Sequence, residues 1–280
     1  MNYRHAFHAG NFADVFKHAV LVRILLHLAG KEAPFRVIDT HSGIGHYDLS
    51  REGSRTHEWR AGIARLIEHP PAGEAGELLA PYLKLVRGLN AGGEFRHYPG
   101  SPAIAQAFCR AQDRMIFCEL HPEDHATLRK NIGPDARAKT AAIDGWTALK
   151  AYLPPKERRG LVLTDPAFEE RDEFARLCSG LAEGHRRWAT GIYLLWYPIK
   201  DREEVHAFER RMAGLQIPKI LRAELSVGAG PKAESLHNCG LIVVNPPWRL
   251  QEELEILLPA LARSLATNGE GKFRLGWIAP

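Results

Sequence analysis

The sequence predicts an α/β protein with a mostly parallel sheet, an antiparallel sheet edge and a small inserted helical subdomain. Short runs rich in β-branched and aromatic residues alternate with longer segments of helical periodicity, which is typical of a sheet covered by helices on both faces. Residues 51–90 depart from this alternation, because they contain helical periodicity and no strand-like run.

The composition is that of an average globular protein. Of its 280 residues, 45% are hydrophobic and 25% are charged. No apolar run approaches the roughly 18 residues that a membrane span needs, and the first residues lack the pattern of a secretory signal. We therefore expect a cytoplasmic protein with no membrane partner. The net charge of +4 permits a nucleic-acid partner without requiring one.

The predicted elements begin with a helix over 12–29. Gly10 and Asn11 are candidates for its N-terminal cap, and Gly30 ends it. The predicted strands then follow in chain order: 35–40, 115–120, 138–143, 161–165, 192–197, 220–227, 240–245 and 273–279. The last two would complete a mixed sheet with an antiparallel edge.

The inserted segment reads as two helices on either side of Pro70-Pro71. Its apolar residues recur at helical spacing: Trp59, Ile63, Leu66, Ile67, Leu78, Leu79, Tyr82, Leu83 and Val86. We therefore predict a main domain formed by 1–50 and 91–280, with a helical subdomain at 51–90. This subdomain could supply extra packing or a wall for a large substrate, and the sequence leaves both roles open.

Cysteine and histidine usage indicates neither disulfides nor a metal site. The four cysteines form no CxxC pair and lie in or beside apolar segments, so we expect buried, reduced thiols: Cys109, Cys118, Cys178 and Cys239. Three early histidines, His5, His8 and His18, are not accompanied by carboxylates or thiols at metal-ligand spacing. We expect no bound metal.

Glycines and acids follow the first four predicted strands, at the edge where an open α/β sheet binds its ligands. They are DTHSGIG (39–45), Glu119, Asp144-Gly145 and Asp165. One acid can accept hydrogen bonds from ribose hydroxyls and another from an adenine amino group, which predicts an adenosine pocket. Because neither GxGxxG nor GxxxxGK[ST] occurs, S-adenosylmethionine is the predicted cofactor. The alternative is that these acids only cap helices.

The stretch DPAF (165–168) suits methyl transfer to an exocyclic amine. Asp165 and the Pro166 carbonyl can accept hydrogen bonds from the amine, while Phe168 offers a face on which an extruded base can stack. NPPW (245–248) is a closer match to the general [DNS]PP[YFW] pattern of amino-methyltransferases. We favour Asp165, because Asn245 follows strands expected far along the sheet, and we interpret 245–248 as a rigid turn near the mouth of the cleft.

Motifs along nearly the whole chain resemble the RlmJ family of bacterial 23S rRNA adenine-N6 methyltransferases. They are NYRHAFHAGNFADVFKH (2–18), DTHSGIG, YPGSP (98–102), CELHP (118–122), DG (144–145), RRGLVLTDPAF (158–168), GIYLLWYP (191–198) and VVNPPW (243–248). The resemblance implies a Rossmann-like class I methyltransferase domain with a helical subdomain after the first strand. It also implies methylation of N6 of one adenine in 23S rRNA, using S-adenosylmethionine.

The resemblance implies roles for residues at matching positions. Cofactor binding would fall on Lys17 or His18 and on His41, Ser101, Glu119, Asp144, Gly145 and Asp165. Asp165 would be the catalytic acid, and Tyr3 would contact the RNA substrate with Pro166 and Phe168. The sequence departs from the family at DPAF, where the family reads DPPY. This departure puts the reaction rate in doubt.

The expected partner is 23S rRNA, either free of protein or in an early assembly intermediate, with no obligate protein partner. Candidate RNA contacts are Arg51, Arg55, Arg60, Arg65, Arg158, Arg159, Arg186 and Arg187. Two alternatives stay open: methylation of a DNA adenine or a protein amide, and a non-enzymatic assembly factor that retains only cofactor binding.

Overall fold

The protein is described here from a computed structural model, which describes residues 7–50, 56–92, 94–228, 236–267 and 271–280. Its strands are β1 (Arg36–Asp39), β2 (His46–Asp48), β3 (His97–Pro99), β4 (Arg114–Cys118), β5 (Ala138–Ala141), β6 (Gly160–Thr164), β7 (Ile192–Pro198), β8 (Ile220–Ser226), β9 (Asn238–Val244) and β10 (Lys272–Ala279). All eight predicted strands are present. The three-residue strands β2 and β3, which pair with each other, were not predicted.

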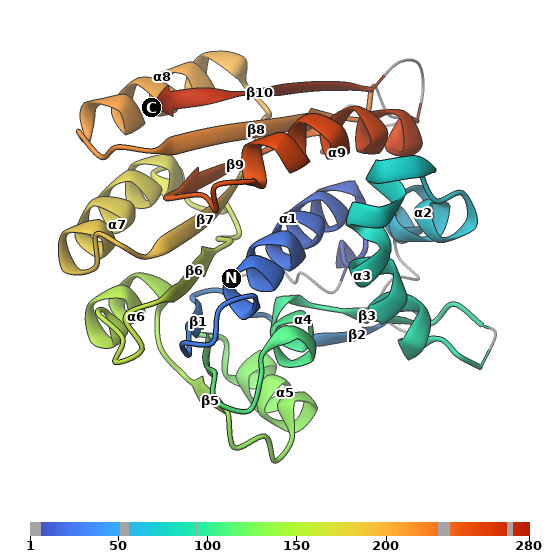
Figure 1. The fold of residues 1–280 in the computed structure, drawn as a ribbon, viewed down its shortest axis with the longest axis horizontal. Coiled ribbons are helices and arrows are strands. Elements are labelled where there is room, and N and C mark those ends of the chain that lie inside the picture. Colours follow the sequence, from blue (N-terminus) through green and yellow to red (C-terminus); the bar gives the residue numbers. More distant parts are fainter. Residues whose placement is uncertain (1–6, 51–55, 93, 229–235, 268–270) are drawn as a thin grey trace.

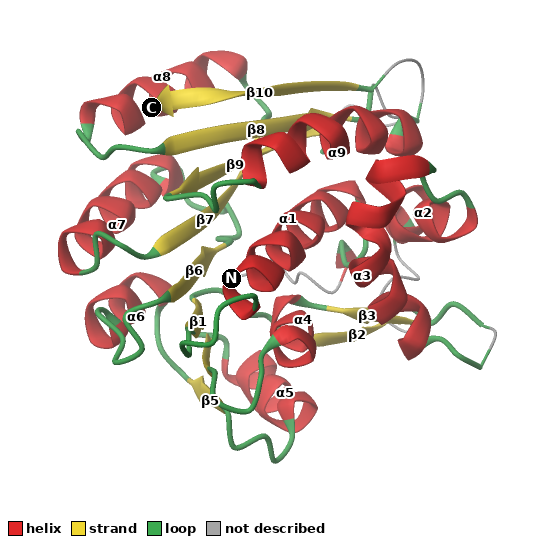
Figure 2. Ribbon diagram, viewed as in Figure 1, coloured by secondary structure: helices red, strands yellow, loops and turns green. Residues whose placement is uncertain are grey.

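Eight strands form one sheet in the order β10-β8-β9-β7-β6-β1-β4-β5 (Figures 1 and 2). Strands β5, β4, β1, β6 and β7 pair in parallel. Strand β9 lies antiparallel to both β7 and β8, and β10 is antiparallel to β8. The mostly parallel sheet with an antiparallel edge is therefore confirmed.

Helices cover both faces of the sheet, as Figure 1 shows. The helices are α1 (Phe12–Ala29), η2 (Arg60–Ala64), α2 (Arg65–Glu68), α3 (Gly73–Leu89), α4 (Ser101–Phe108), α5 (Pro122–Ile132), α6 (Gly145–Tyr152), α7 (Glu173–Arg187), α8 (Arg202–Gly214) and α9 (Leu250–Leu265). One face carries α1, α4, α5 and α9, and the other carries α6, α7 and α8. Within the described ranges, no helix is long and apolar enough to cross a membrane.

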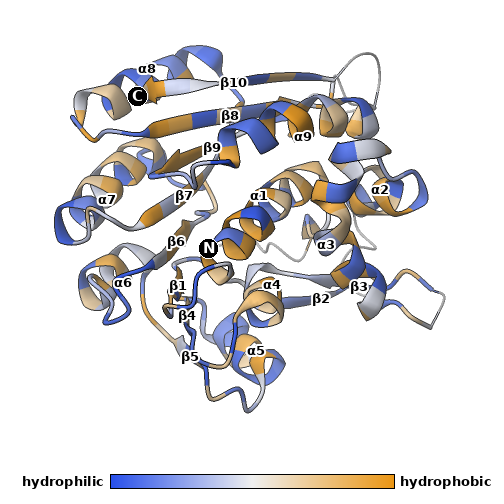
Figure 3. Cartoon of the chain, in the orientation of Figure 1, coloured by the Kyte–Doolittle hydropathy of each residue, from blue (hydrophilic) through white to orange (hydrophobic). Residues whose placement is uncertain are grey.

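Alternating side chains of the strands enter two cores, one on each face. In β6, Leu161 and Leu163 join the core under α1, whereas Val162 joins the core under α7. This alternation follows from the two-residue period of a strand. Figure 3 shows hydrophobic residues along the central strands and α1. The four cysteines are buried and free, as predicted.

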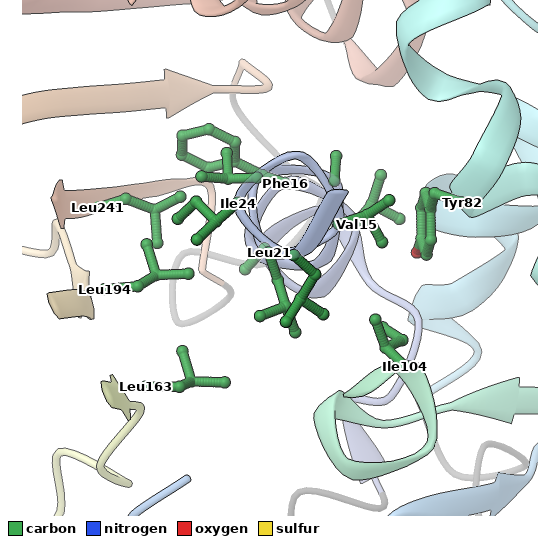
Figure 4. Packing of buried hydrophobic residues seen from close by; sticks show 14 of the residues in the cluster. Val15, Phe16, Leu21, Ile24, Tyr82, Ile104, Leu163, Leu194 and Leu241 are labelled. Carbon is green, nitrogen blue, oxygen red and sulfur yellow. The ribbon is translucent and has the colours of Figure 1, made fainter. Parts of the chain in front are cut away.

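Helix α1 is the central helix of the larger core. Of its 18 residues 14 are buried, because it packs between the sheet and the helices α3, α4 and α9. Figure 4 shows Phe16 and Ile24 on the side of the strand residues Leu194 and Leu241, with Val15 facing Tyr82 of α3. Polar side chains on so buried a helix need partners inside the protein.

The ends of α1 follow the sequence prediction. Asn11 is the N-cap, since its side chain accepts a hydrogen bond from the Asp14 N–H at 3.0 Å, and Gly30 is the C-cap.

The inserted helices share the core of α1. Gly62 lies so close to the N-terminal segment that a Cβ there would come within 2.1 Å of the Gly10 carbonyl oxygen. The Ile63 N–H donates to the same oxygen at 2.9 Å. The division into domains at 51 and 90 stays a prediction, and the two predicted helices on either side of Pro70-Pro71 are confirmed.

Candidate active site

A cavity of about 410 Å³ opens at the carboxyl edge of the sheet. Strand β1 lies between β4 and β6: the chain passes from β1 to β4 and β5 on one side and then crosses over to β6 and β7 on the other. This is the topological switch point at which open α/β sheets bind ligands. The cavity is within the size range of ordinary small-molecule sites.

Ten of the eleven residues predicted for the site line this one cavity. They are Lys17, His18, His41, Ser101, Glu119, Asp144, Gly145, Asp165, Pro166 and Phe168. The eleventh, Tyr3, lies outside the described residues. Tertiary structure therefore brings together residues from α1, α4 and the loops after four strands, while their individual roles stay predictions.

A buried ion-pair cluster joins α1 to the catalytic candidate. The Lys17 ammonium donates to Oδ2 of Asp165 and lies 3.0 Å from Oδ1 of Asp14. The side chains of Lys17, Asp14 and Asp165 are 5%, 1% and 14% exposed. Burial alone would lower the pKa of Lys17, but the two carboxylates outweigh it and the pKa is raised. Lysine 17 is therefore charged at neutral pH.

Asp14 was missed in the sequence. Its second oxygen accepts the Gly10 N–H at 2.9 Å, so the carboxylate ties Lys17 to the start of α1. The signal that could have found Asp14 is its spacing of three residues from Lys17 within a mostly apolar helix, since such a pair shares one helix face.

The His41 ring lies against the start of α6. A Cβ at Gly145 would come within 2.5 Å of the Thr40 carbonyl oxygen and 2.7 Å of the His41 ring, so only glycine fits this contact. The His41 ring also packs edge-on against Trp146, with 5.4 Å between the ring centroids. Burial lowers the pKa of His41 to about 4, so the imidazole is neutral at pH 7.

Glu119 fixes the glycine-rich loop as well as facing the cavity. One carboxylate oxygen accepts the Gly43 N–H at 2.9 Å and the other accepts the His121 N–H at 2.8 Å. Burial raises the pKa of this carboxyl group, although both N–H donors oppose the shift. Each oxygen keeps a second lone pair with which it can accept a ligand hydroxyl.

Asp144 caps α6 and lines the cavity at the same time. Its Oδ2 accepts the Thr147 N–H at 2.8 Å and the Thr147 hydroxyl at 3.0 Å. Among the residues that the structure describes, none donates to Oδ1. The two interpretations of this acid, helix cap and ligand acceptor, are therefore compatible because they use different oxygens.

A second buried acid positions Ser101. The Ser101 hydroxyl donates to Oδ2 of Asp39 at 2.6 Å, and the His41 N–H donates to the other oxygen at 3.2 Å. Burial raises the pKa of Asp39 to about 6, against these two hydrogen bonds. The sequence placed Asp39 at the end of a strand but gave no sign of its pairing with a serine 62 residues away.

Phe168 borders the cavity in a constrained conformation. Its φ of 52° lies in the left-handed region, which is uncommon for a residue other than glycine. The half-buried ring packs edge-on against Phe174 and Trp196, with centroid distances of 5.0 and 5.8 Å. These contacts fix the orientation of the ring beside Asp165.

The expectation that 245–248 lies near the mouth of the cleft is wrong. Strand β9 runs antiparallel to β7, and Val244 pairs with Tyr193 near the start of β7. Asn245 therefore lies at the amino ends of the parallel strands, on the side of the sheet away from the cavity. There its amide donates to the carbonyl oxygens of Ala189 and Gly191 at 2.8 Å each. The reversed strand direction separates the two similar motifs.

The candidate RNA-binding arginines fall in different environments. Arg51 and Arg55 lie outside the described residues. Arg159 precedes β6 and thus lies at the edge away from the cavity, donating to the Leu28 and Ala33 carbonyl oxygens. Two more arginines of the set pair with Glu183.

Comparison with known proteins identifies the family. The family model described as "Ribosomal RNA large subunit methyltransferase D, RlmJ" matches residues 32–279. The chain belongs to the RlmJ family. Two proteins named "Ribosomal RNA large subunit methyltransferase J" are similar over 100% of this chain and 99% of their own length. The Haemophilus influenzae protein is 42% identical and the Escherichia coli protein 41% identical.

The RlmJ fold is also found in a crystal structure of a Legionella pneumophila protein. That structure has a TM-score of 0.87 and 33% identity, and the match covers 96% of this chain and 98% of the other. As a member of the RlmJ family, this chain is a methyltransferase. In the described part of the chain, no group of three or more His, Cys, Asp or Glu side chains could hold a metal ion.

Proposed function

We propose that this enzyme uses S-adenosylmethionine to methylate the N6 amino group of a specific adenine in 23S rRNA. The observation that carries the proposal is the cavity in which Asp165, Pro166 and Phe168 adjoin the acids that follow β4 and β5. The family description and the names of the two curated relatives support an rRNA substrate. Such a substrate is met in the cytoplasm.

The residues of the cavity fit the cofactor. Glu119 would accept hydrogen bonds from the ribose hydroxyls with its remaining lone pairs, and Oδ1 of Asp144 would accept one from the adenine amino group. When bound, S-adenosylmethionine supplies an electrophilic methyl group on a sulfonium. Several acids line the cavity, which suits a cationic ligand of this kind.

Asp165 prepares the target amine. Its Oδ2 is held by the Lys17 ammonium, and no residue in the described ranges donates to Oδ1. Oδ1 would accept a hydrogen bond from the target N6 amino group, and the Pro166 carbonyl would accept the second. These two hydrogen bonds reduce the conjugation of the N6 nitrogen with the adenine ring, so the nitrogen lone pair becomes available to the methyl group. Lys17 thus orients the acid without occupying both of its oxygens.

Phe168 holds the target base after extrusion from the RNA. A base stacked on an aromatic side chain gains about 1–3 kcal/mol, which offsets part of the cost of unstacking. The edge-on contacts with Phe174 and Trp196 hold the Phe168 ring in place for this stacking. Ala167 stands where the family has a second proline, and the rigid position of Phe168 keeps catalysis possible.

A transfer assay with two matched variants tests the proposal. Tritiated S-adenosylmethionine is incubated with 23S rRNA from cells that lack this protein, and the labelled nucleotide is mapped. Asp165→Ala should abolish labelling, whereas Asn245→Ala, in the similar motif at the opposite edge, should retain it. Label on any base position other than adenine N6, or full labelling by the Asp165 variant, would refute the proposal.

The state of the RNA substrate is tested in the same assay. Protein-free 23S rRNA, early assembly intermediates and complete large subunits are offered in parallel. We expect labelling of the first two without any added protein partner, because an extruded base must reach a cavity at the sheet edge. Labelling confined to complete subunits would contradict this expectation.

A further inference from the structure

Three buried side chains form a hydrogen-bonded chain from the inserted helices to the active-site cavity. Tyr82 belongs to α3, Tyr98 to β3 and His18 to α1. The hydroxyl oxygens of Tyr82 and Tyr98 are 2.9 Å apart, and the Tyr98 hydroxyl lies 2.7 Å from Nδ1 of His18. All three side chains are at most 1% exposed, so bulk water does not reach these hydrogen bonds.

The two hydroxyl protons have few possible hydrogen-bond acceptors. In the part of the chain that the structure describes, the Tyr82 hydroxyl contacts no polar group except the Tyr98 hydroxyl, and the Tyr98 hydroxyl contacts only Tyr82 and His18. Burial raises the pKa of both tyrosines, so both stay protonated at neutral pH. A buried hydroxyl proton without an acceptor is costly.

Only one order of donors and acceptors gives both hydroxyl protons an acceptor. If Tyr82 donates to Tyr98 and Tyr98 donates to Nδ1 of His18, both hydroxyl protons are bonded. If Nδ1 instead carries a proton and donates to Tyr98, one of the tyrosine protons is left without an acceptor. The first arrangement puts the proton of neutral His18 on Nε2.

The surroundings of Nε2 favour the same arrangement independently. Nε2 of His18 lies 3.9 Å from Oδ1 of Asp14, the oxygen that also contacts Lys17. An N–H facing this carboxylate is attractive, whereas a lone pair would be repulsive. The cluster of Asp14, Lys17 and Asp165 contains two carboxylates and one ammonium, so it gains from a further positive dipole.

We infer that Tyr98 fixes His18 as the Nε2–H tautomer and points this N–H at the Asp14–Lys17–Asp165 cluster. Tyr98 is then a positioning residue for Asp165, acting through His18 and Asp14. In this arrangement the inserted helices contribute the Tyr82 hydroxyl, which donates to Tyr98. Figure 4 shows Tyr82 on α3 beside α1.

The tautomer is measured directly by nitrogen NMR of the imidazole rings in the full-length protein without ligand. The His18 signals are assigned by their loss in His18→Gln. In the wild type we expect a protonated Nε2 and an unprotonated Nδ1. In Tyr98→Phe we expect part of the population to carry the proton on Nδ1, whereas Tyr82→Phe should keep the wild-type tautomer because Tyr98 can still donate.

Tyr193→Phe is the matched control. It removes a buried hydroxyl that donates to the Trp188 carbonyl oxygen at 2.9 Å on the other face of the sheet, so the His18 signals should not change. A proton on Nδ1 in the wild type overturns the inference, as does an unchanged tautomer in Tyr98→Phe. Should Tyr98→Phe not fold, the wild type and Tyr82→Phe still test the inference, because a proton on Nδ1 in either protein would overturn it.

A kinetic measurement tests the link to catalysis and rests on the proposed function. Tyr98→Phe should lower kcat by about 3- to 10-fold, the effect of one neutral hydrogen bond, and leave the KM for RNA unchanged. A merely structural role would lower the stability without this split between kcat and KM. The NMR measurement needs neither cofactor nor RNA, so failure of the proposed function leaves its outcome informative.

Discussion

Replacement of Lys17 by methionine isolates the energetics of the buried cluster. The change keeps an unbranched side chain of similar length but removes the ammonium that contacts both Asp14 and Asp165. Breaking a buried ion pair from one side costs about 3–5 kcal/mol, because an uncompensated charge stays buried. Asp165 is 14% exposed and lines a cavity that water can enter, whereas Asp14 is 1% exposed. The penalty should therefore arise mainly at Asp14 and lie near 3 kcal/mol, the lower end of that range.

The stability lost in Lys17→Met should increase as the pH rises from 4 to 7. In the Lys17→Met variant, loss of the ammonium raises the folded-state pKa of Asp14 relative to the wild type. A group whose pKa is raised on folding favours the folded state at low pH and loses this contribution as pH increases. The difference from the wild type should therefore be smallest near pH 4 and grow toward pH 7. In the wild type the raised pKa keeps Lys17 charged, so its stabilisation persists up to the ordinary lysine pKa of about 10.4.

Urea unfolding followed by circular dichroism measures these differences. A loss of 3 kcal/mol should move the urea midpoint by about 1 M or more, given an m-value up to about 3 kcal/mol/M. Lys84→Met, at an exposed lysine of α3, is the matched control and should change stability by less than about 0.5 kcal/mol. Adding Asp14→Asn to Lys17→Met should restore about 1–2 kcal/mol. A loss below about 1 kcal/mol in Lys17→Met, or no recovery in the double variant, would refute the reasoning.

Two further predictions concern the N-terminal segment and the start of α6. The hydrogen bond to Glu58 raises the pKa of His8, so this pair stabilises the fold below about pH 6.5 and its contribution is lost as pH rises through the raised pKa. Glu58→Gln should remove this pH dependence. The pair should contribute less than about 1 kcal/mol, because both side chains are over a third exposed. An unchanged pH profile of thermal unfolding in the variant would contradict this prediction. Gly145→Ala forces a Cβ to within 2.5 Å of the Thr40 carbonyl oxygen and should cost about 1–3 kcal/mol, with weaker cofactor binding by calorimetry. Gly88→Ala in α3, where a Cβ meets nothing within 4 Å, should cost nothing, and equal losses in both variants would show that steric contact is not the cause.

Local patterns in the sequence were sufficient to predict the strands of the large sheet and both ends of α1. The central strands are apolar runs whose side chains alternate between two buried faces, and such a run can be recognised without knowledge of its neighbours. Asn11 caps α1 through a contact within three residues. The strands β2 and β3 were missed because three residues are too few to show a period.

The position of Asp165 could be predicted because parallel strands end at one edge of a sheet. The same rule failed for Asn245, since it requires the direction of β9, and that direction depends on its pairing with β7 and β8. The similar stretches 165–168 and 245–248 thus lie at opposite ends of the parallel strands. Sequence similarity between them carries no information on strand direction.

The sequence by itself predicted ten of the residues that line the cavity, because the acids and glycines among them follow parallel strands that end on the same side of the sheet. Only the tertiary structure decided which of these groups touch. The pairing of Lys17 with Asp165 joins residues 148 positions apart, and the link from Tyr82 through Tyr98 to His18 crosses three separate elements. Such contacts are fixed by how helices pack on a sheet, and packing depends on the whole core and not on any local pattern.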